Sequence, residues 1–93
     1  MRIVWSETAI ANLVDIRRYI EQDQPEAARR LAARILASVD RLAAHPHLGR
    51  PGREPGTREL VVAGTPYIIP YRVYRDRLSI LAVLHAAQKG PKE

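Results

Sequence analysis

The sequence contains no cysteine. Disulfide bonds, thiolate metal ligands and cysteine nucleophiles are therefore excluded. The three histidines, His45, His47 and His85, lack the spacing of zinc ligands and have no cluster of carboxylates beside them, so we expect neither a metal ion nor a cofactor. No apolar run approaches the roughly 18 residues of a membrane span, and the first residues lack the long apolar segment of a secretory signal. We therefore expect a cytoplasmic protein without a membrane partner.

Length and charge narrow the remaining possibilities. The chain has 93 residues, which suits a single domain over residues 1–93 and leaves no room for separate cofactor and substrate modules. Fifteen Lys and Arg residues against ten Asp and Glu give a net charge of +5, and 13 of the 15 cations are Arg. A small basic protein attracts polyanions, so the expected partner is either a nucleic acid or an acidic protein.

The first half of the chain has the pattern of a short strand followed by two amphipathic helices. Residues 2–5 predict the strand, and Ser6 is placed to cap the next helix. Apolar residues recur at helical spacing, namely Ala9, Leu13, Ile16 and Ile20 in the first helix and Ala28, Leu31, Ile35, Val39 and Leu42 in the second. Pro25 suits the first turn of the second helix, with Asp23 or Gln24 as its cap. The short connection predicts an antiparallel helical hairpin.

The second half predicts a loop and three strands. Pro and Gly recur through residues 46–57, which indicates the loop. Strands are expected at residues 59–63, 67–74 and 78–85, joined by two-residue turns at 64–65 and 75–76. Pro70 has no amide hydrogen, so a bulge or an unpaired amide is expected beside it. Residues 86–93 form a polar tail. The predicted fold class is α+β, in the order β-α-α-β-β-β, with the helical hairpin packed on one face of a mainly antiparallel sheet.

The two predicted hairpin turns also determine which strand residues share a face of the sheet. One face is almost wholly apolar and is expected beneath the helices. The other face carries Val61, Ile68, Pro70, Arg72, Ser79, Leu81, Val83 and His85. No further part of the chain is left to cover the apolar members of this open face, and an exposed apolar patch of this kind commonly marks a partner-binding surface. A slip of one residue in either hairpin would exchange the two faces.

Several segments have an order and spacing that point to a known family. They are Trp5-Ser6 before the helical hairpin, HPHLGRP at 45–51, TREL at 57–60, YIIPYRV at 67–73 and LSILAVLH at 78–85. Together they cover almost the whole chain and resemble the RelE/ParE superfamily of bacterial toxins from type II toxin–antitoxin modules. The resemblance implies a protein that inhibits bacterial growth and that a cognate antitoxin neutralises.

The superfamily offers two activities. RelE-type members are ribosome-dependent mRNA endonucleases, whereas ParE-type members poison DNA gyrase. For a nuclease, the resemblance implies Arg72 as the phosphate-stabilising cation, Arg58 as a further cation and His85 as an acid or base. The nuclease pattern is incomplete, because Arg50 and Arg53 are the nearest cations where RelE itself uses lysines, and Arg is a poor general base. The terminal tyrosine of RelE is also missing after His85.

The loop at 48–51 and the segments around Arg72 and His85 are more similar to the ParE branch. The expected function is therefore ParE-like growth inhibition through DNA gyrase. The first alternative is a RelE-like ribosome-dependent mRNA endonuclease with the ribosome as its partner. The second alternative is a non-toxic basic module that binds nucleic acid.

In the toxin reading, the resemblance implies a cognate antitoxin with an acidic toxin-binding segment. The residues expected to contact it on the open face are Val61, Ile68, Arg72, Leu81 and Val83. Arg50 and Arg53 form a basic loop near this face. DNA is expected to be reached only through the antitoxin. The net charge of +5 then indicates complementarity to an acidic protein.

Overall fold

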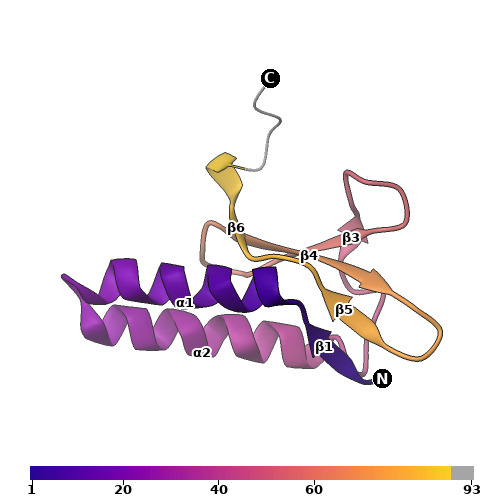
Figure 1. Ribbon diagram of the computed structural model, residues 1–93, viewed down its shortest axis with the longest axis horizontal. Helices are drawn as coiled ribbons and strands as arrows, with labels where there is room; N and C mark the ends of the chain where they lie inside the picture. The colour runs from indigo at the N-terminus through magenta and orange to yellow at the C-terminus, as the bar shows by residue number, and fades with distance from the viewer. Residues whose placement is uncertain (89–93) are drawn as a thin grey trace.

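The computed structural model describes residues 1–88 and has two layers, a helical hairpin and a sheet (Figure 1). The helices are α1 (Glu7–Glu21) and α2 (Pro25–Arg41), and a short 3-10 helix (Ala86–Gln88) follows the last strand. The strands are β1 (Ile3–Trp5), β2 (Arg50–Pro51), β3 (Arg58–Val61), β4 (Tyr67–Val73), β5 (Leu78–Ile80) and β6 (Leu84–His85). The predicted α+β class is confirmed. Strand β2 and the division of the last strand into two were not predicted, and residues 89–93 of the predicted tail lie outside the described residues.

Both helices begin where the sequence predicts. The Ser6 hydroxyl oxygen accepts a hydrogen bond from the Ala9 amide at 3.0 Å, which satisfies one of the free N–H groups at the start of α1. Pro25 occupies the first position of α2, where its missing N–H is not needed. Gln24 is the N-cap residue of α2, but its side chain makes no capping hydrogen bond.

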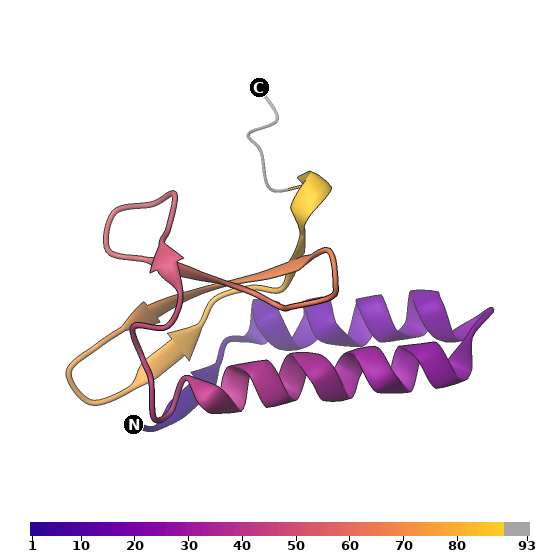
Figure 2. The same cartoon turned by 180° about the vertical axis from the view of Figure 1, so that it is seen from behind.

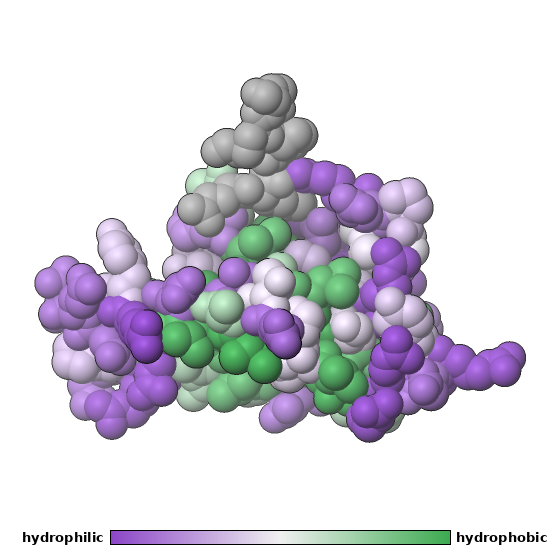
Figure 3. All heavy atoms as spheres, in the orientation of Figure 1, coloured by the Kyte–Doolittle hydropathy of each residue, from purple (hydrophilic) through white to green (hydrophobic). Residues whose placement is uncertain are grey.

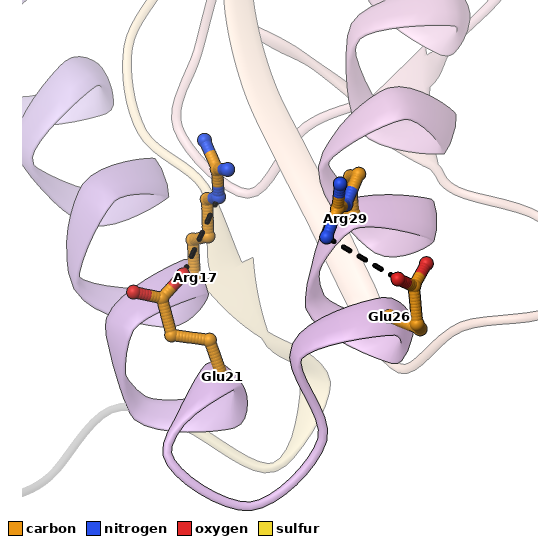
Figure 4. A network of polar contacts seen from close by, with 4 residues as sticks. All are labelled: Arg17, Glu21, Glu26 and Arg29. Atoms are coloured by element: carbon orange, nitrogen blue, oxygen red, sulfur yellow. Dashed lines mark hydrogen bonds and ion pairs between the residues drawn. The ribbon is translucent and has the colours of Figure 1, made fainter.

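Two ion pairs flank the turn between the helices (Figure 4). Arg17 and Glu21 of α1 lie 3.6 Å apart, and Arg29 and Glu26 of α2 lie 3.3 Å apart. All four side chains are largely exposed, so each pair contributes about 0.5 kcal/mol or less. The antiparallel hairpin is therefore held by its apolar faces and not by these charges.

The sheet has the strand order β1-β5-β4-β3-β2, and β6 pairs with the first residues of β4. β1 runs parallel to β5, while the other pairs are antiparallel. Val61 lies opposite Ile68 across the first hairpin, and Val73 lies opposite Leu78 across the second. Both registers are those that the two-residue turns predict.

The last predicted strand is interrupted beside Pro70. The Leu81 amide donates to the Pro70 carbonyl oxygen at 2.9 Å, but Pro70 has no N–H to donate in return. Strand pairing with β4 then resumes at Leu84, in a register shifted by one residue. Tyr67 lies opposite His85, whereas the register of the β4–β5 hairpin would place Leu84 there. This shift exchanges the two faces for the last strand segment.

The prediction that Val83 and His85 lie on the open face is therefore wrong. Val83 is only 3% exposed and belongs to the core, and its amide donates to the side-chain oxygen of Asn12 in α1 at 3.0 Å. His85 shares the helix-covered face with Tyr67, its partner in the register. Leu84 takes the position beside Ile68 that was predicted for Val83.

The core lies between the helical hairpin and the inner face of the sheet. Its most deeply buried side chains come from both layers and are Ala9, Ile35, Val39, Leu42, Val62, Ile69, Tyr71, Leu78 and Ile80. Leu13, Ile16 and Leu31 pack against this cluster, so the predicted helix stripes face the sheet. Each fully buried large apolar side chain contributes roughly 1.5–3 kcal/mol. Figure 3 shows apolar residues gathered in the middle of one face of the molecule and hydrophilic residues towards both ends.

Candidate functional site

The open face of the sheet carries the first candidate surface. The loop between β2 and β3 and the end of the described chain both stand on the side away from the helices (Figures 1 and 2). A cleft of about 340 Å³, here called the open-face cleft, is lined by Arg53, Glu54, Thr57, Glu59, Pro70, Arg72, Leu81 and Leu84. Of the predicted apolar contacts, Val61 is 50% exposed, but Ile68 is only 5% exposed because Val61 and Leu84 flank it in the register. Val61 and Leu81 thus remain as accessible apolar members of the predicted set.

Arg72 is a cation of the open-face cleft. It lies opposite Ser79 in the register, and its guanidinium reaches the β2–β3 loop, where a Cβ atom at Gly56 would lie 2.5 Å from Arg72 Nη1. Gly56 has a φ angle of +82°, which glycine adopts without strain, and its missing side chain leaves room for the guanidinium. No ion pair or hydrogen bond engages Arg72 among residues 1–88. Its N–H donors are therefore available to an anionic group.

Glu59 organises the predicted basic loop. Glu59 is 7% exposed, and its carboxylate accepts hydrogen bonds from the Arg53 amide at 3.2 Å and from the Arg50 guanidinium at 3.5 Å. The ion pair with Arg50 balances part of the positive charge that this segment carries. A buried carboxylate needs such partners, so Arg50 has a structural role and does not act only as an exposed cation.

Arg58 also has a structural role. Its guanidinium donates to the carbonyl oxygens of Gly49 at 2.6 Å and His47 at 3.4 Å, which fixes the loop after α2. Arg58 lies opposite the buried Tyr71 and shares its face of the sheet, the face away from Arg72. The Tyr71 hydroxyl accepts from the Gly49 amide and donates to the Pro46 carbonyl, both at 2.8 Å. Burial raises the pKa of Tyr71, and the Gly49 hydrogen bond and the Arg58 charge offset part of this rise.

His85 lies in a second and larger cleft, between α1 and the last strands. This cleft of about 550 Å³, here called the α1–β6 cleft, is lined by Asn12, Asp15, Ile16, Tyr19, Tyr67, Val83, Leu84 and His85. The rings of Tyr67 and His85 meet edge to face, with their centroids 5.4 Å apart. The Ala87 amide donates to His85 Nδ1 at 3.1 Å, so the other ring nitrogen is the one free to donate. Burial, and secondarily the neighbouring Tyr19, raise the pKa of Tyr67.

The three residues predicted for a nuclease site are therefore not brought together. Arg58 and His85 lie opposite Tyr71 and Tyr67, which are four residues apart on β4, or roughly 13 Å along the strand. Arg72 lies on the other face of that strand. The geometry separates a histidine in the α1–β6 cleft from an arginine in the open-face cleft.

Sequence reasoning did not find the α1–β6 cleft. Asn12, Asp15 and Tyr19 recur at helical spacing beside the apolar stripe of α1. This pattern is the feature by which the sequence indicates the helix wall of the cleft. The sequence pattern could not place the opposite wall of the cleft, because the one-residue shift in β6 brings His85 to the helix side.

Within residues 1–88, no group of three or more acidic and histidine side chains is placed to hold a metal ion. No helix in the same range is long and apolar enough to cross a membrane.

The family model of the ParE toxin of the type II toxin–antitoxin system parDE matches residues 3–90 of the chain. The chain belongs to the ParE toxin family. The putative toxin Y4kP of Sinorhizobium fredii is 54% identical over 98% of this chain and 94% of that protein. Toxin RelE2 of Caulobacter vibrioides is 41% identical over 94% of this chain and 97% of that protein.

Solved structures agree with this ParE family membership. The chromosomal ParDE toxin–antitoxin system of Pseudomonas aeruginosa contains a chain with a TM-score of 0.83 and 30% identity, covering 91% of this chain and 95% of that one. The toxin–antitoxin complex RelBE2 of Mycobacterium tuberculosis contains a chain with the same fold, at a TM-score of 0.67 and 24% identity, covering 90% and 95%. The relatives carry both ParE and RelE names, so family membership establishes a type II toxin but does not choose its target.

Proposed function

We propose that this toxin is ParE-like, that it arrests growth by acting on DNA gyrase, and that it does not cleave mRNA on the ribosome. The observation that carries the proposal is the separation of Arg72 from His85 and Arg58. The match to the ParE family model and the likeness to the ParDE structure also favour this branch.

RNA cleavage through the 2′-hydroxyl needs a proton acceptor and a charge-stabilising group at the same phosphate. A general base must come within about 2.6–3.2 Å of the proton that it removes, and charge-stabilising donors must lie about 3 Å from the developing charge. His85 and Arg72 occupy different clefts on different faces of β4. One scissile phosphate cannot meet both groups without rearrangement of the last strand.

The test is induced expression of the toxin in a bacterium that lacks the antitoxin. We expect growth arrest with filamentation and DNA-damage signalling, and we expect His85→Ala to retain this toxicity. Rapid loss of protein synthesis with codon-phased mRNA cuts, abolished by His85→Ala, would instead establish the RelE-like activity. His45→Ala, in the exposed loop after α2, is the matched control. Unaffected growth would favour a non-toxic basic module.

We further propose that the open-face cleft receives the cognate antitoxin. Arg72 offers an unengaged guanidinium beside the apolar side chains of Leu81 and Leu84. The exposed Val61 lies outside this cleft, across Ile68 from Leu84 in the register. An acidic side chain within an otherwise apolar segment matches this arrangement, because carboxylates pair bidentately with guanidinium groups. The sheet face also suits an extended segment.

The antitoxin is sought in the open reading frame next to the toxin gene, and the two proteins are purified together. We expect Arg72→Ala to weaken the complex about tenfold or more and to reduce its salt dependence. Arg75→Ala, in the exposed turn between β4 and β5, removes the same charge away from the cleft and should leave affinity within about twofold. A complex that is indifferent to salt and to Arg72→Ala would contradict this contact.

A further inference from the structure

The α1–β6 cleft, with a volume of about 550 Å³, has an unusual set of polar groups. One wall consists of Asp15 and Tyr19, one turn apart on α1. The other wall consists of Tyr67 of β4 and His85 of β6, whose rings meet edge to face. The cleft is therefore lined by three rings and one carboxylate.

Asp15 is the charged group that defines the chemistry of the cleft. No hydrogen bond or ion pair engages its carboxylate among residues 1–88, although the protein carries a net charge of +5. The nearest cations along α1, Arg17 and Arg18, line a different depression together with Val14 and Glu21. Asn12 is already engaged by the Val83 amide. Asp15 thus faces the cleft as a free acceptor.

A cation satisfies this arrangement better than other ligands. Ammonium and guanidinium groups bind over the faces of tyrosine rings, and a carboxylate adds a charge-assisted hydrogen bond. An anion would be repelled by Asp15, and a purely apolar group would remove Asp15 from water without giving it a partner. A tyrosine phenol is neutral near pH 7, and burial moves the pKa of Tyr67 further upward, so its hydroxyl can donate or accept without adding charge.

We propose that the α1–β6 cleft binds a single lysine or arginine side chain of the cognate antitoxin. This inference rests on the proposed function, and it goes beyond charge complementarity. An acidic segment suits the basic surface as a whole, whereas a cation at one position of that segment suits the α1–β6 cleft. A binding surface that carries both a cation and a carboxylate determines the register and direction of the segment that it binds. It also disfavours partners that would place a carboxylate in the α1–β6 cleft.

The first experiment measures binding of the antitoxin encoded beside the gene to immobilised toxin variants. Asp15→Asn should weaken binding about tenfold, mainly through faster dissociation. Tyr19→Ala should weaken it about fivefold, and because Tyr19 is exposed this change leaves the core intact. Asp23→Asn, in the exposed turn between the helices, removes the same charge elsewhere and should remain within about twofold. Asp15→Asn binding within twofold of the unmodified toxin would overturn the proposal.

The second experiment separates this inference from the proposed function. The peptide acetyl-Ala-Arg-Ala-amide is titrated into the isotope-labelled toxin, with acetyl-Ala-Glu-Ala-amide as the control. We expect shifts at the ring signals of Tyr19, Tyr67 and His85 with the arginine peptide, and their loss in Asp15→Asn. If the neighbouring gene product does not bind the toxin, the proposed partner fails, yet these shifts would still support a cation site. Ring signals that do not move would overturn that site as well.

Discussion

Replacing Tyr71 by Phe should destabilise the fold strongly, although the ring itself is kept. Tyr71 is fully buried, and its hydroxyl joins the sheet to the loop after α2 through two hydrogen bonds of 2.8 Å. The change leaves the buried Gly49 amide without its acceptor, which costs about 1–3 kcal/mol. It also leaves the half-buried Pro46 carbonyl without its donor, which costs about 0.5–1.5 kcal/mol more. We therefore expect a total loss of about 1.5–4.5 kcal/mol.

This loss is large for a chain of this size. Domains of this length unfold with free energies of about 5–15 kcal/mol, and each kcal/mol shifts the melting temperature by roughly 4–8 °C. Urea unfolding followed by the fluorescence of Trp5, which packs against the core, should show a lower midpoint at an unchanged slope. Tyr74→Phe, at a partly exposed ring in the next turn, is the matched control and should stay within about 0.5 kcal/mol. A loss below about 1 kcal/mol for Tyr71→Phe would refute the reasoning.

Three further predictions concern the framework of the two clefts. Ser6→Ala removes the α1 cap and should cost about 1–2 kcal/mol in urea unfolding. Glu59→Gln removes the buried charge that holds the basic loop and should cost about 1–3 kcal/mol, whereas the exposed Glu54→Gln should change stability by less than about 0.5 kcal/mol. Burial raises the pKa of both Tyr67 and Tyr71 above 10.0. Their contribution to stability is therefore fully present below pH 10 and lost as pH rises through the folded values, and this fall in the urea midpoint should be smaller in Tyr71→Phe.

Local chemistry was sufficient to predict the helices and the two hairpins. Ser6 and Pro25 mark helix starts by their hydrogen-bonding capacity, which does not depend on the rest of the fold. The two-residue turns fix the hairpin registers because strand residues alternate between faces. Pro70 correctly predicted a local defect in pairing, since its missing amide hydrogen is a property of the residue alone.

The rest depended on tertiary contacts that no local pattern specifies. The sequence indicates that strand pairing fails beside Pro70, but it does not indicate whether the chain later pairs with β4 in the same register. That register is determined in part by Val83, which is buried against α1 and whose amide donates a hydrogen bond to Asn12. Strand β2 is only two residues long and includes Pro51, so it lacks a strand pattern. The candidate site was only partly predicted for the same reason: Arg72 and Leu81 lie before the shift and were placed correctly, and His85 lies after it.

Leu84 belongs to the lining of both clefts. It lies beside Ile68 in the register, between His85 and the buried Val83. A partner segment that crosses β6 at Leu84 would therefore meet Arg72 on one side and Asp15 on the other. These charges are opposite, so only one direction of the segment places a carboxylate at Arg72 and a cation at Asp15. In the uninterrupted register Val83 would lie beside Ile68 on the open face, in the position that Leu84 occupies.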